Sequence, residues 1–167
     1  DDLWIGTYTG GVNVLNTKTG GFRIYTTKAG DPTTLDRSSS YAIFKDREAR
    51  IWVTSMSGVN LYNREEDNFT RIRDLGSWIM DIDQDADGNI WFSSQGNGLF
   101  KYNPDKQEWT NYVHSNAPGA LINDQVNCVL IDGNGEMWIG TMNGLCKYNA
   151  KEDQFELIPL DIPSSNI

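Results

Sequence analysis

Residues able to carry acid–base catalysis are scarce in this chain. Its 167 residues include a single histidine, His114. No second histidine and no Ser/Asp set points to it, as a nucleophile and its general base would require. His114 is expected in a loop, where it is either solvated or in contact with a ligand. The sequence therefore predicts that this segment is not an enzyme.

Three aspartates are spaced as in the first half of a calcium-binding loop. Asp83, Asp85 and Asp87 precede Gly88, which stands at the sixth position of such a loop. The twelfth position is Ser94 rather than a bidentate glutamate, and strands rather than helices are expected on both sides. We interpret the segment as a turn rich in Asp and Gly, with calcium as the weaker alternative, and predict no metal and no cofactor.

The two cysteines, Cys128 and Cys146, form neither a metal-ligand cluster nor a disulfide framework. Both lie in predicted strands that a third strand separates, so their backbones should be ~9.5 Å apart. A disulfide requires Cα atoms within about 7 Å. The sequence therefore predicts two free, buried thiols.

The amino-acid composition limits the classes of molecule that this chain can bind. Hydrophobic residues make up 38% of the chain, which indicates a globular protein. The 14 Lys and Arg against 23 Asp and Glu give a net charge of −9. Nucleic acids and anionic membrane surfaces repel such a protein, so neither is expected to bind. The chain does not begin with Met, and its first residues already lie in a repeat, so we expect a segment of a longer protein.

The elements that would position any site come from one unit that occurs four times. An aliphatic residue, a Trp, an aliphatic or aromatic residue and two small residues recur in each copy. The four stretches are Leu3–Thr7, Ile51–Ser55, Ile90–Ser94 and Met137–Thr141. Such self-similarity determines the architecture.

Each Trp is followed by a segment that runs from Gly to Asn, and then by an aromatic residue six positions after that Asn. In the three later copies an Asp stands six positions before the Trp. Short β-rich pieces bounded by Gly, Asn and Asp predict strands and turns. The spacing predicts an all-β fold: a β-propeller fragment of four-stranded antiparallel blades, residues 1–167, whose first blade lacks its innermost strand. The expected blades are 1–26, 40–74, 77–113 and 124–159, with 160–167 as the lead-in to another.

The repeated Trp residues are interpreted as core residues. Blades pack face to face, so a large ring on a covered strand fills the gap between neighbours. Packing is therefore preferred over ligand contact for Trp4, Trp52, Trp91 and Trp138.

The pattern resembles a known family. It is similar to the two-component regulator propeller repeat. The shared features, in chain order, are an Asp, a Gly/Asn turn, Leu/Ile/Met-Trp-Ile-Gly-Thr, Gly-Leu-x-x-Tyr-Asn and a later aromatic residue. The likeness runs from Leu3 to Ile158, although the second and third copies carry Thr54-Ser55 and Ser93-Ser94 in place of Gly-Thr. The resemblance implies the periplasmic sensor region of a hybrid two-component histidine kinase anchored in the inner membrane. It further implies an oligosaccharide ligand, additional blades in the parent chain and a homodimer.

Ligand recognition is expected on one face of the fragment. In an up-and-down blade, the loop after the Trp strand and the connection to the next blade lie on the same face. The connections 29–37, 73–77 and 114–120 differ greatly in length, and variation on a uniform scaffold indicates specificity. Sugars bind through aromatic faces and amide hydrogen bonds. The candidate ligand-binding residues are Tyr8, Trp78, Gln95, Asn97, His114 and Asn143.

Two other functions are open. A propeller lyase that cleaves a glycan would need His, Glu or Arg clustered near the axis, and the sequence shows no such cluster. A propeller that serves as a protein-binding scaffold would be compatible with the acidic surface.

Overall fold

The computed structural model describes residues 2–159, which form fifteen strands in four antiparallel sheets. The first sheet holds β1 (Asp2–Gly6), β2 (Val12–Asn16) and β3 (Phe22–Tyr25). The second holds β4 (Ile43–Lys45), β5 (Ile51–Thr54), β6 (Gly58–Asn63) and β7 (Asn68–Asp74). The third holds β8 (Ile79–Gln84), β9 (Ile90–Ser94), β10 (Leu99–Asn103) and β11 (Glu108–Tyr112). The fourth holds β12 (Val126–Ile131), β13 (Met137–Thr141), β14 (Gly144–Asn149) and β15 (Gln154–Ile158).

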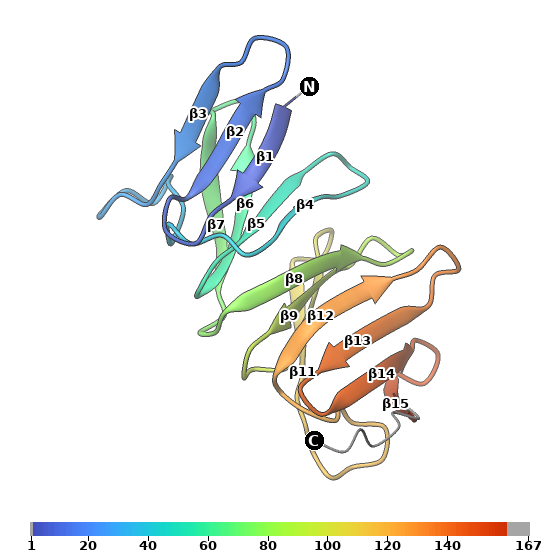
Figure 1. Ribbon diagram of the computed structural model, residues 1–167. Coiled ribbons are helices and arrows are strands. Elements are labelled where there is room, and N and C mark those ends of the chain that lie inside the picture. Colours follow the sequence, from blue (N-terminus) through green and yellow to red (C-terminus); the bar gives the residue numbers. More distant parts are fainter. Residues whose placement is uncertain (1, 160–167) are drawn as a thin grey trace, which may run out of the picture.

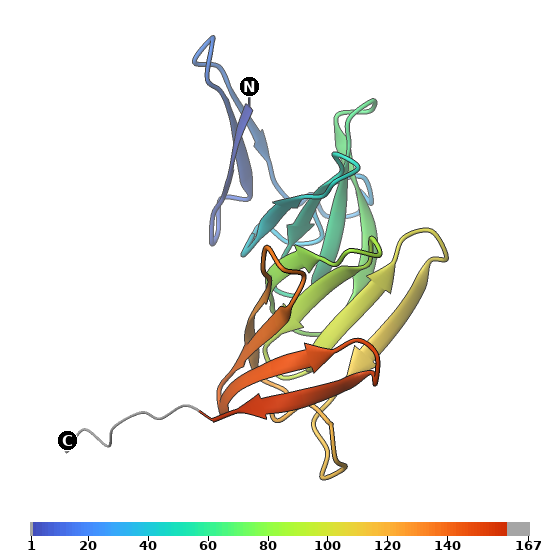
Figure 2. The same ribbon diagram turned by 90° about the vertical axis from the view of Figure 1, so that its right-hand side faces the viewer.

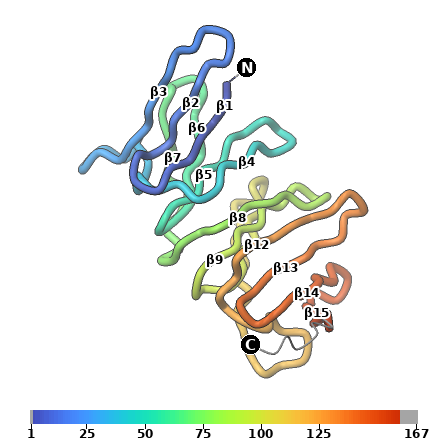
Figure 3. Tube along the Cα trace, in the orientation of Figure 1, coloured from blue at the N-terminus to red at the C-terminus, as the bar shows by residue number. Residues whose placement is uncertain are grey.

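The sheets are blades of a propeller, which confirms the predicted fold class. Within each sheet the strands pair in chain order, and the first sheet has three strands. The blades follow one another along an arc, with the first and fourth at opposite ends (Figure 1). The innermost strands β4, β8 and β12 run along its inner side, where β8 lies against both others (Figure 3). Among residues 2–159, no helix is long and apolar enough to cross a membrane.

The hydrophobic core lies between the blades rather than inside them. One cluster joins Val12 and Val14 of the first blade to Val53 and Phe69 of the second. Equivalent clusters join the second blade to the third and the third to the fourth. Each blade is a single layer, so it buries its apolar faces only against its neighbours.

The repeated Trp rings lie at these junctions. The first three each contact the Tyr at the end of the third strand of the following blade. The ring centroids are 4.8 Å apart for Trp4 and Tyr62, 6.0 Å for Trp52 and Tyr102, and 5.0 Å for Trp91 and Tyr148. Trp52 and Trp91 are fully buried, whereas Trp4 and Trp138 are half-buried. Trp138 belongs to the last blade within the described residues, so its ring has no such Tyr there.

The Asp that precedes each of the three later Trp residues is explained by a hydrogen bond. The indole Nε1 donates to Asp46 in the second blade (2.7 Å), to Asp85 in the third (2.8 Å) and to Asp132 in the fourth (3.1 Å). The same carboxylates accept backbone N–H groups of the turn that leads to the Trp strand. A buried indole N–H needs such a partner, so the spacing of six links the turn to the core.

Gly and Asn delimit the third strand of each blade for geometric reasons. A Cβ on Gly98 would lie 2.1 Å from the carbonyl oxygen of Tyr112, and Gly11 and Gly58 are equally close to the neighbouring strand. At the other end, Oδ1 of Asn16 accepts the backbone N–H groups of Lys18 and Thr19. The predicted turn-starting role of this Asn is confirmed.

The prediction of two buried thiols is wrong for one of them. Cys128 on β12 and Cys146 on β14 are separated by β13 and are both free, and Cys146 is buried. Cys128 is exposed. It pairs with Gly140, which has no side chain to cover it, and its Sγ lies over that glycine.

Candidate ligand-binding site

Two of the predicted ligand residues are linked through a third aromatic ring. Tyr8, in the loop between β1 and β2, meets Tyr41 edge-on, with ring centroids 6.3 Å apart. Tyr41 stacks on Trp78 at 6.0 Å, with 18° between the ring planes. Tyr8 is 64% exposed and Trp78 is 42% exposed, so the three rings present a solvent-accessible aromatic surface across three blades.

Polar and thioether side chains continue this line into the fourth blade. The backbone N–H of Gln95 donates to the carbonyl of Trp78 (2.9 Å). The Gln95 amide donates to the side chain of Asn127 (3.3 Å), whose own amide lies 3.6 Å from the sulfur of Met142. We call the six residues the inner-edge row: Tyr8, Tyr41, Trp78, Gln95, Asn127 and Met142.

The start of each innermost strand positions the row. Between Val126 and Cys128 the pairing with β13 slips by one residue, so Asn127 occupies a bulge. A bulge turns a side chain away from the regular alternation of the strand. Trp78 directly precedes β8, where Ile79 donates to the carbonyl of Ser55 in the second blade (3.0 Å). The backbone under the row is therefore fixed by neighbouring blades.

Two hydroxyl groups beneath the aromatic part of the row lack a hydrogen-bond partner among the described residues. The Tyr41 hydroxyl and the Ser40 Oγ are both buried, and Ser40 as a whole is 8% exposed. Burial raises the pKa of Tyr41, so its hydroxyl stays neutral. Unpaired buried hydroxyls are costly, and an ordered water would satisfy them.

The remaining predicted site residues lie elsewhere or have structural partners. Asn143 is exposed beside Met142. Asn97 donates its amide to the carbonyl of Leu75 (2.9 Å). His114 follows the outer strand β11, where its ring Nδ1 lies 2.9 Å from the carbonyl of Leu121. The row thus joins Tyr8, Trp78 and Gln95, but Asn97 and His114 are not part of it.

Sequence reasoning missed Tyr41 and Asn127. Their spacing in the sequence could have identified them. Both stand five positions before the Asp that accepts the indole N–H of the following Trp, and Met80 stands at the same position in the third blade. Counting back from Asp46 and Asp132 would have placed them at one structural position. The expected alternation of a regular strand hid it.

The long connections between blades contribute to the packing of the blades. Leu35, between the first two blades, and Leu121, between the last two, are each 1% exposed. The backbone N–H of Phe69 donates to Thr33, and that of Phe155 donates to Gly119. Figure 2 shows the connection from β11 to β12 projecting from the sheets. These connections hold the outer strand of the next blade.

The aspartates of the calcium-like loop point in different directions. Asp83 accepts the backbone N–H of Ile131 in the fourth blade (2.6 Å), and Asp85 accepts the Trp91 indole. Asp87 is exposed in the turn. Within the described range 2–159, no group of three or more His, Cys, Asp or Glu residues is arranged to hold a metal ion.

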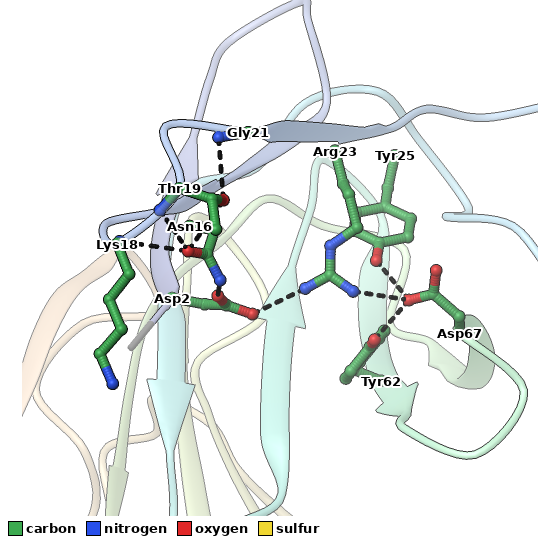
Figure 4. Close-up of polar contacts among 9 residues, drawn as sticks. All are labelled: Asp2, Asn16, Lys18, Thr19, Gly21, Arg23, Tyr25, Tyr62 and Asp67. Carbon is green, nitrogen blue, oxygen red and sulfur yellow. Dashed lines mark hydrogen bonds and ion pairs between the residues drawn. The ribbon is translucent and has the colours of Figure 1, made fainter.

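A cavity of about 770 Å³ lies between the first two blades, at the opposite end of the strands from the row. Beside it, the hydroxyls of Tyr25 and Tyr62 both donate to Asp67 at 2.5 Å, and Arg23 bridges Asp67 (3.3 Å) and Asp2 (2.7 Å) (Figure 4). The two Tyr hydrogen bonds hold the pKa of Asp67 below its usual range. Because these polar groups bond one another, we interpret the cluster as a joint between blades.

The joint recurs between the third and fourth blades. Asp153 accepts the hydroxyls of Tyr112 (2.7 Å) and Tyr148 (2.5 Å), which lowers its pKa. Burial and the bond to Asp153 raise the pKa of Tyr148 to about 12. Between the second and third blades the corresponding residues are Ile72 and Gln107. We call the two Tyr–Asp–Tyr sets the clasps.

Comparisons with known proteins agree with the repeat. Residues 120–143 match the family model described as "Two component regulator propeller". The predicted resemblance is thereby confirmed in the stretch that includes β12 and β13. No curated protein matches the chain.

The similar solved structures are propellers. The extracellular domain of the hybrid two component system BT3049 from B. thetaiotaomicron is 24% identical, with a TM-score of 0.79 over 93% of this chain and 21% of that chain. That of BT4673 from the same organism is 21% identical, with a TM-score of 0.80 over 100% of this chain and 22% of that chain. Virginiamycin B lyase from Staphylococcus aureus is 12% identical, with a TM-score of 0.72 over 97% of this chain and 53% of that chain. The chain spans about a fifth of the length of the two B. thetaiotaomicron domains.

Proposed function

We propose that this chain is part of the sensor propeller of a two-component system and that its inner-edge row binds an oligosaccharide. The family match over residues 120–143 and the likeness to extracellular domains of two component systems support the sensor role. Fold alone does not define a ligand, so the ligand assignment rests on the row.

The observation that carries the assignment is the exposed aromatic surface of Tyr8, Tyr41 and Trp78 beside two amide side chains. Sugar rings have apolar C–H faces that pack on aromatic rings, and their hydroxyl groups exchange hydrogen bonds with amides. Gln95 and Asn127 supply these amides.

The rest of the proposal concerns the parent protein. The segment would lie in the periplasm, joined to further blades, a membrane anchor and a separate histidine kinase domain. The parent would function as a homodimer, and this segment itself would not be catalytic. The chain's one histidine follows an outer strand, where its ring Nδ1 lies 2.9 Å from the carbonyl of Leu121.

Calorimetry of the intact ectodomain with a panel of oligosaccharides tests the function. Binding heat without any new product is expected, and the Trp78→Ala variant should bind about tenfold more weakly because a stacking surface is lost. Phe22→Ala is the matched control, since Phe22 is an exposed ring at the start of β3, beside the turn at the opposite end of the strands from the row. Cleavage of a sugar would instead support a lyase, and no response to any sugar would favour a protein-binding scaffold.

A further inference from the structure

The inner-edge row contains no charged side chain. Its members are two Tyr, one Trp, one Gln, one Asn and one Met. The residues at the equivalent positions of the other blades are also uncharged: Ser39, Met56, Met80 and Gln125. In a chain with 37 ionisable Asp, Glu, Lys and Arg residues (14 + 23), such a stretch is a distinct chemical surface.

Within the innermost strands, the ionisable residue nearest in sequence to these positions is acidic. Asp81 follows Met80 on β8, and its carboxylate accepts the backbone N–H of Val129 (3.2 Å). Burial raises the pKa of Asp81. An anionic ligand on the row would therefore meet no cation of the row itself and a protein of net charge −9 around it.

Three cations of the first two blades lie at the other end of the strands. Arg23, Lys45 and Arg64 line the 770 Å³ cavity beside the clasp. Arg71 is committed to the carbonyls of Asp31, Thr34 and Leu35, and the Arg73 guanidinium lies 5.2 Å from the Trp109 ring. Arg71 and Arg73 line a second cavity with Arg37, Ser57 and Asp74, at the same end of the strands as the row, but none of these cations is a member of the row.

Recognition of carboxylates and sulfates requires such cations. Anionic groups are bound through charge-assisted hydrogen bonds, most often from Arg, because burying an unpaired charge is costly. Aromatic rings, thioethers and amides instead suit the apolar faces and hydroxyl groups of uncharged sugars. The chemistry of the row therefore discriminates between two ligand classes.

Resting on the proposed function, we infer that the inner-edge row selects neutral oligosaccharides and rejects those that carry uronic carboxylates or sulfate esters. The uncharged side chains of the row, and the absence of any cation among its members, carry this inference. It concerns the charge of the ligand and leaves the identity of the sugar open.

Matched ligand pairs test it in the intact ectodomain. Oligogalacturonides are compared with their methyl esters, alongside neutral oligosaccharides and sulfated ones, by calorimetry at low and moderate salt. Neutral sugars and esters are expected to bind at least about tenfold more tightly than the charged forms. Tighter binding of a charged form than of its ester would overturn the inference while leaving the sensor function intact. If no ligand of either class binds, the proposed function itself fails.

Two variants complete the test. Gln95→Lys adds a cation to the row and should raise affinity for the oligogalacturonide while lowering it for the neutral sugar. Lys45→Ala removes a cation at the opposite face and should leave both affinities unchanged. A loss of neutral binding in Lys45→Ala with unchanged binding in Gln95→Lys would move the site to the cavity and contradict the inference. Near-UV circular dichroism confirms that each variant is folded.

Discussion

At the scale of the residue, the Asp–Trp hydrogen bond links a surface turn to the core. Asp46 has no exposed side-chain area, although it lies in a turn. It accepts the Trp52 indole, the backbone N–H of Arg50 and the Arg50 guanidinium. Asp46 is therefore required for the structure of the blade and is not a solvated surface carboxylate.

Substituting Asp46 by Ala should destabilise the fold by about 2–4 kcal/mol, because the buried indole N–H and a turn N–H lose their acceptor. Urea denaturation measures this loss. Asp132→Ala is the control, because it makes the same bond to a half-buried Trp138, whose indole has better access to water. A loss at Asp132 as large as that at Asp46 would contradict the explanation.

The two thiols should differ in reactivity. Cys128 is exposed and is expected to react with a disulfide reagent in the native protein. Cys146 is buried, which raises the pKa of its thiol, so it should react only after unfolding. Counting modified thiols with and without denaturant, and repeating the assay with Cys128→Ser, tests the difference. Two reactive thiols in the native protein would refute it.

At the scale of the element, the third strand of each blade depends on its first glycine. Gly98 has a φ of +77°, and a Cβ there would lie 2.1 Å from a backbone carbonyl oxygen, which cannot move aside like a flexible side chain. This close approach lets the strand begin beside the end of the outer strand. It explains the Gly at this point in the first three copies of the repeat, whereas Gly144 in the fourth copy has a φ of +131° without that contact.

Gly98→Ala should therefore cost more than a glycine substitution that meets only backbone strain. Gly135 has a φ of +81°, and a Cβ added there would have no other atom within 4 Å, so Gly135→Ala should cost about 1–2 kcal/mol. Gly98→Ala adds a steric clash and should cost about 1–3 kcal/mol beyond that. The midpoints of thermal and urea unfolding measure both. Equal losses would show that the carbonyl contact is unimportant.

The elements were predictable from the sequence to the extent that they repeat. Trp, Gly and Asn recur at constant spacing, so the strand order and antiparallel pairing could be predicted from the spacing alone. The constant spacing to the following Asp places Tyr41 and Asn127 at one structural position, but it does not reveal that the strand pairing slips there. The exposure of Cys128 depends on which residue of β13 pairs with it, and the strand register that decides this pairing could not be predicted either.

At the scale of the whole molecule, the blades are joined by two kinds of contact. Apolar clusters occur at all three junctions, whereas the clasps occur at the first and the third. The candidate site crosses all four blades. Its assembly could not be predicted in full from the sequence, because Tyr8, Tyr41 and Trp78 belong to three blades and meet only when those blades pack side by side.

The clasps should make stability depend on pH in the acidic range. The pKa of Asp153 is lower in the folded protein, so its contribution to stability is present above the unfolded pKa of about 3.9 and is lost as pH falls below it. Tyr148→Phe should therefore be destabilising at pH 7, with a difference from the unmodified protein that shrinks below about pH 4. Urea unfolding across pH 3–7 tests this.

The control is Tyr102→Phe at the junction between the second and third blades. Tyr102 occupies the position of Tyr148, but Gln107 stands there in place of the clasp Asp. Its substitution should show no comparable dependence on pH between 3 and 7. The same pH profile for both variants would mean that the Asp–Tyr bonds are not its source.

The alternation of clasped and unclasped junctions has a consequence for rearranging the gene. Tyr25 and Asp67 lie in different blades, as do Tyr112 and Asp153. A crossover at the junction between the first and second blades, or between the third and fourth, therefore separates a carboxylate from one of its hydroxyl donors. A crossover between the second and third blades, where Ile72 and Gln107 replace a clasp Tyr and its Asp, leaves both clasps whole. By this criterion the smallest transferable unit of this chain is a pair of blades, although its sequence repeats blade by blade.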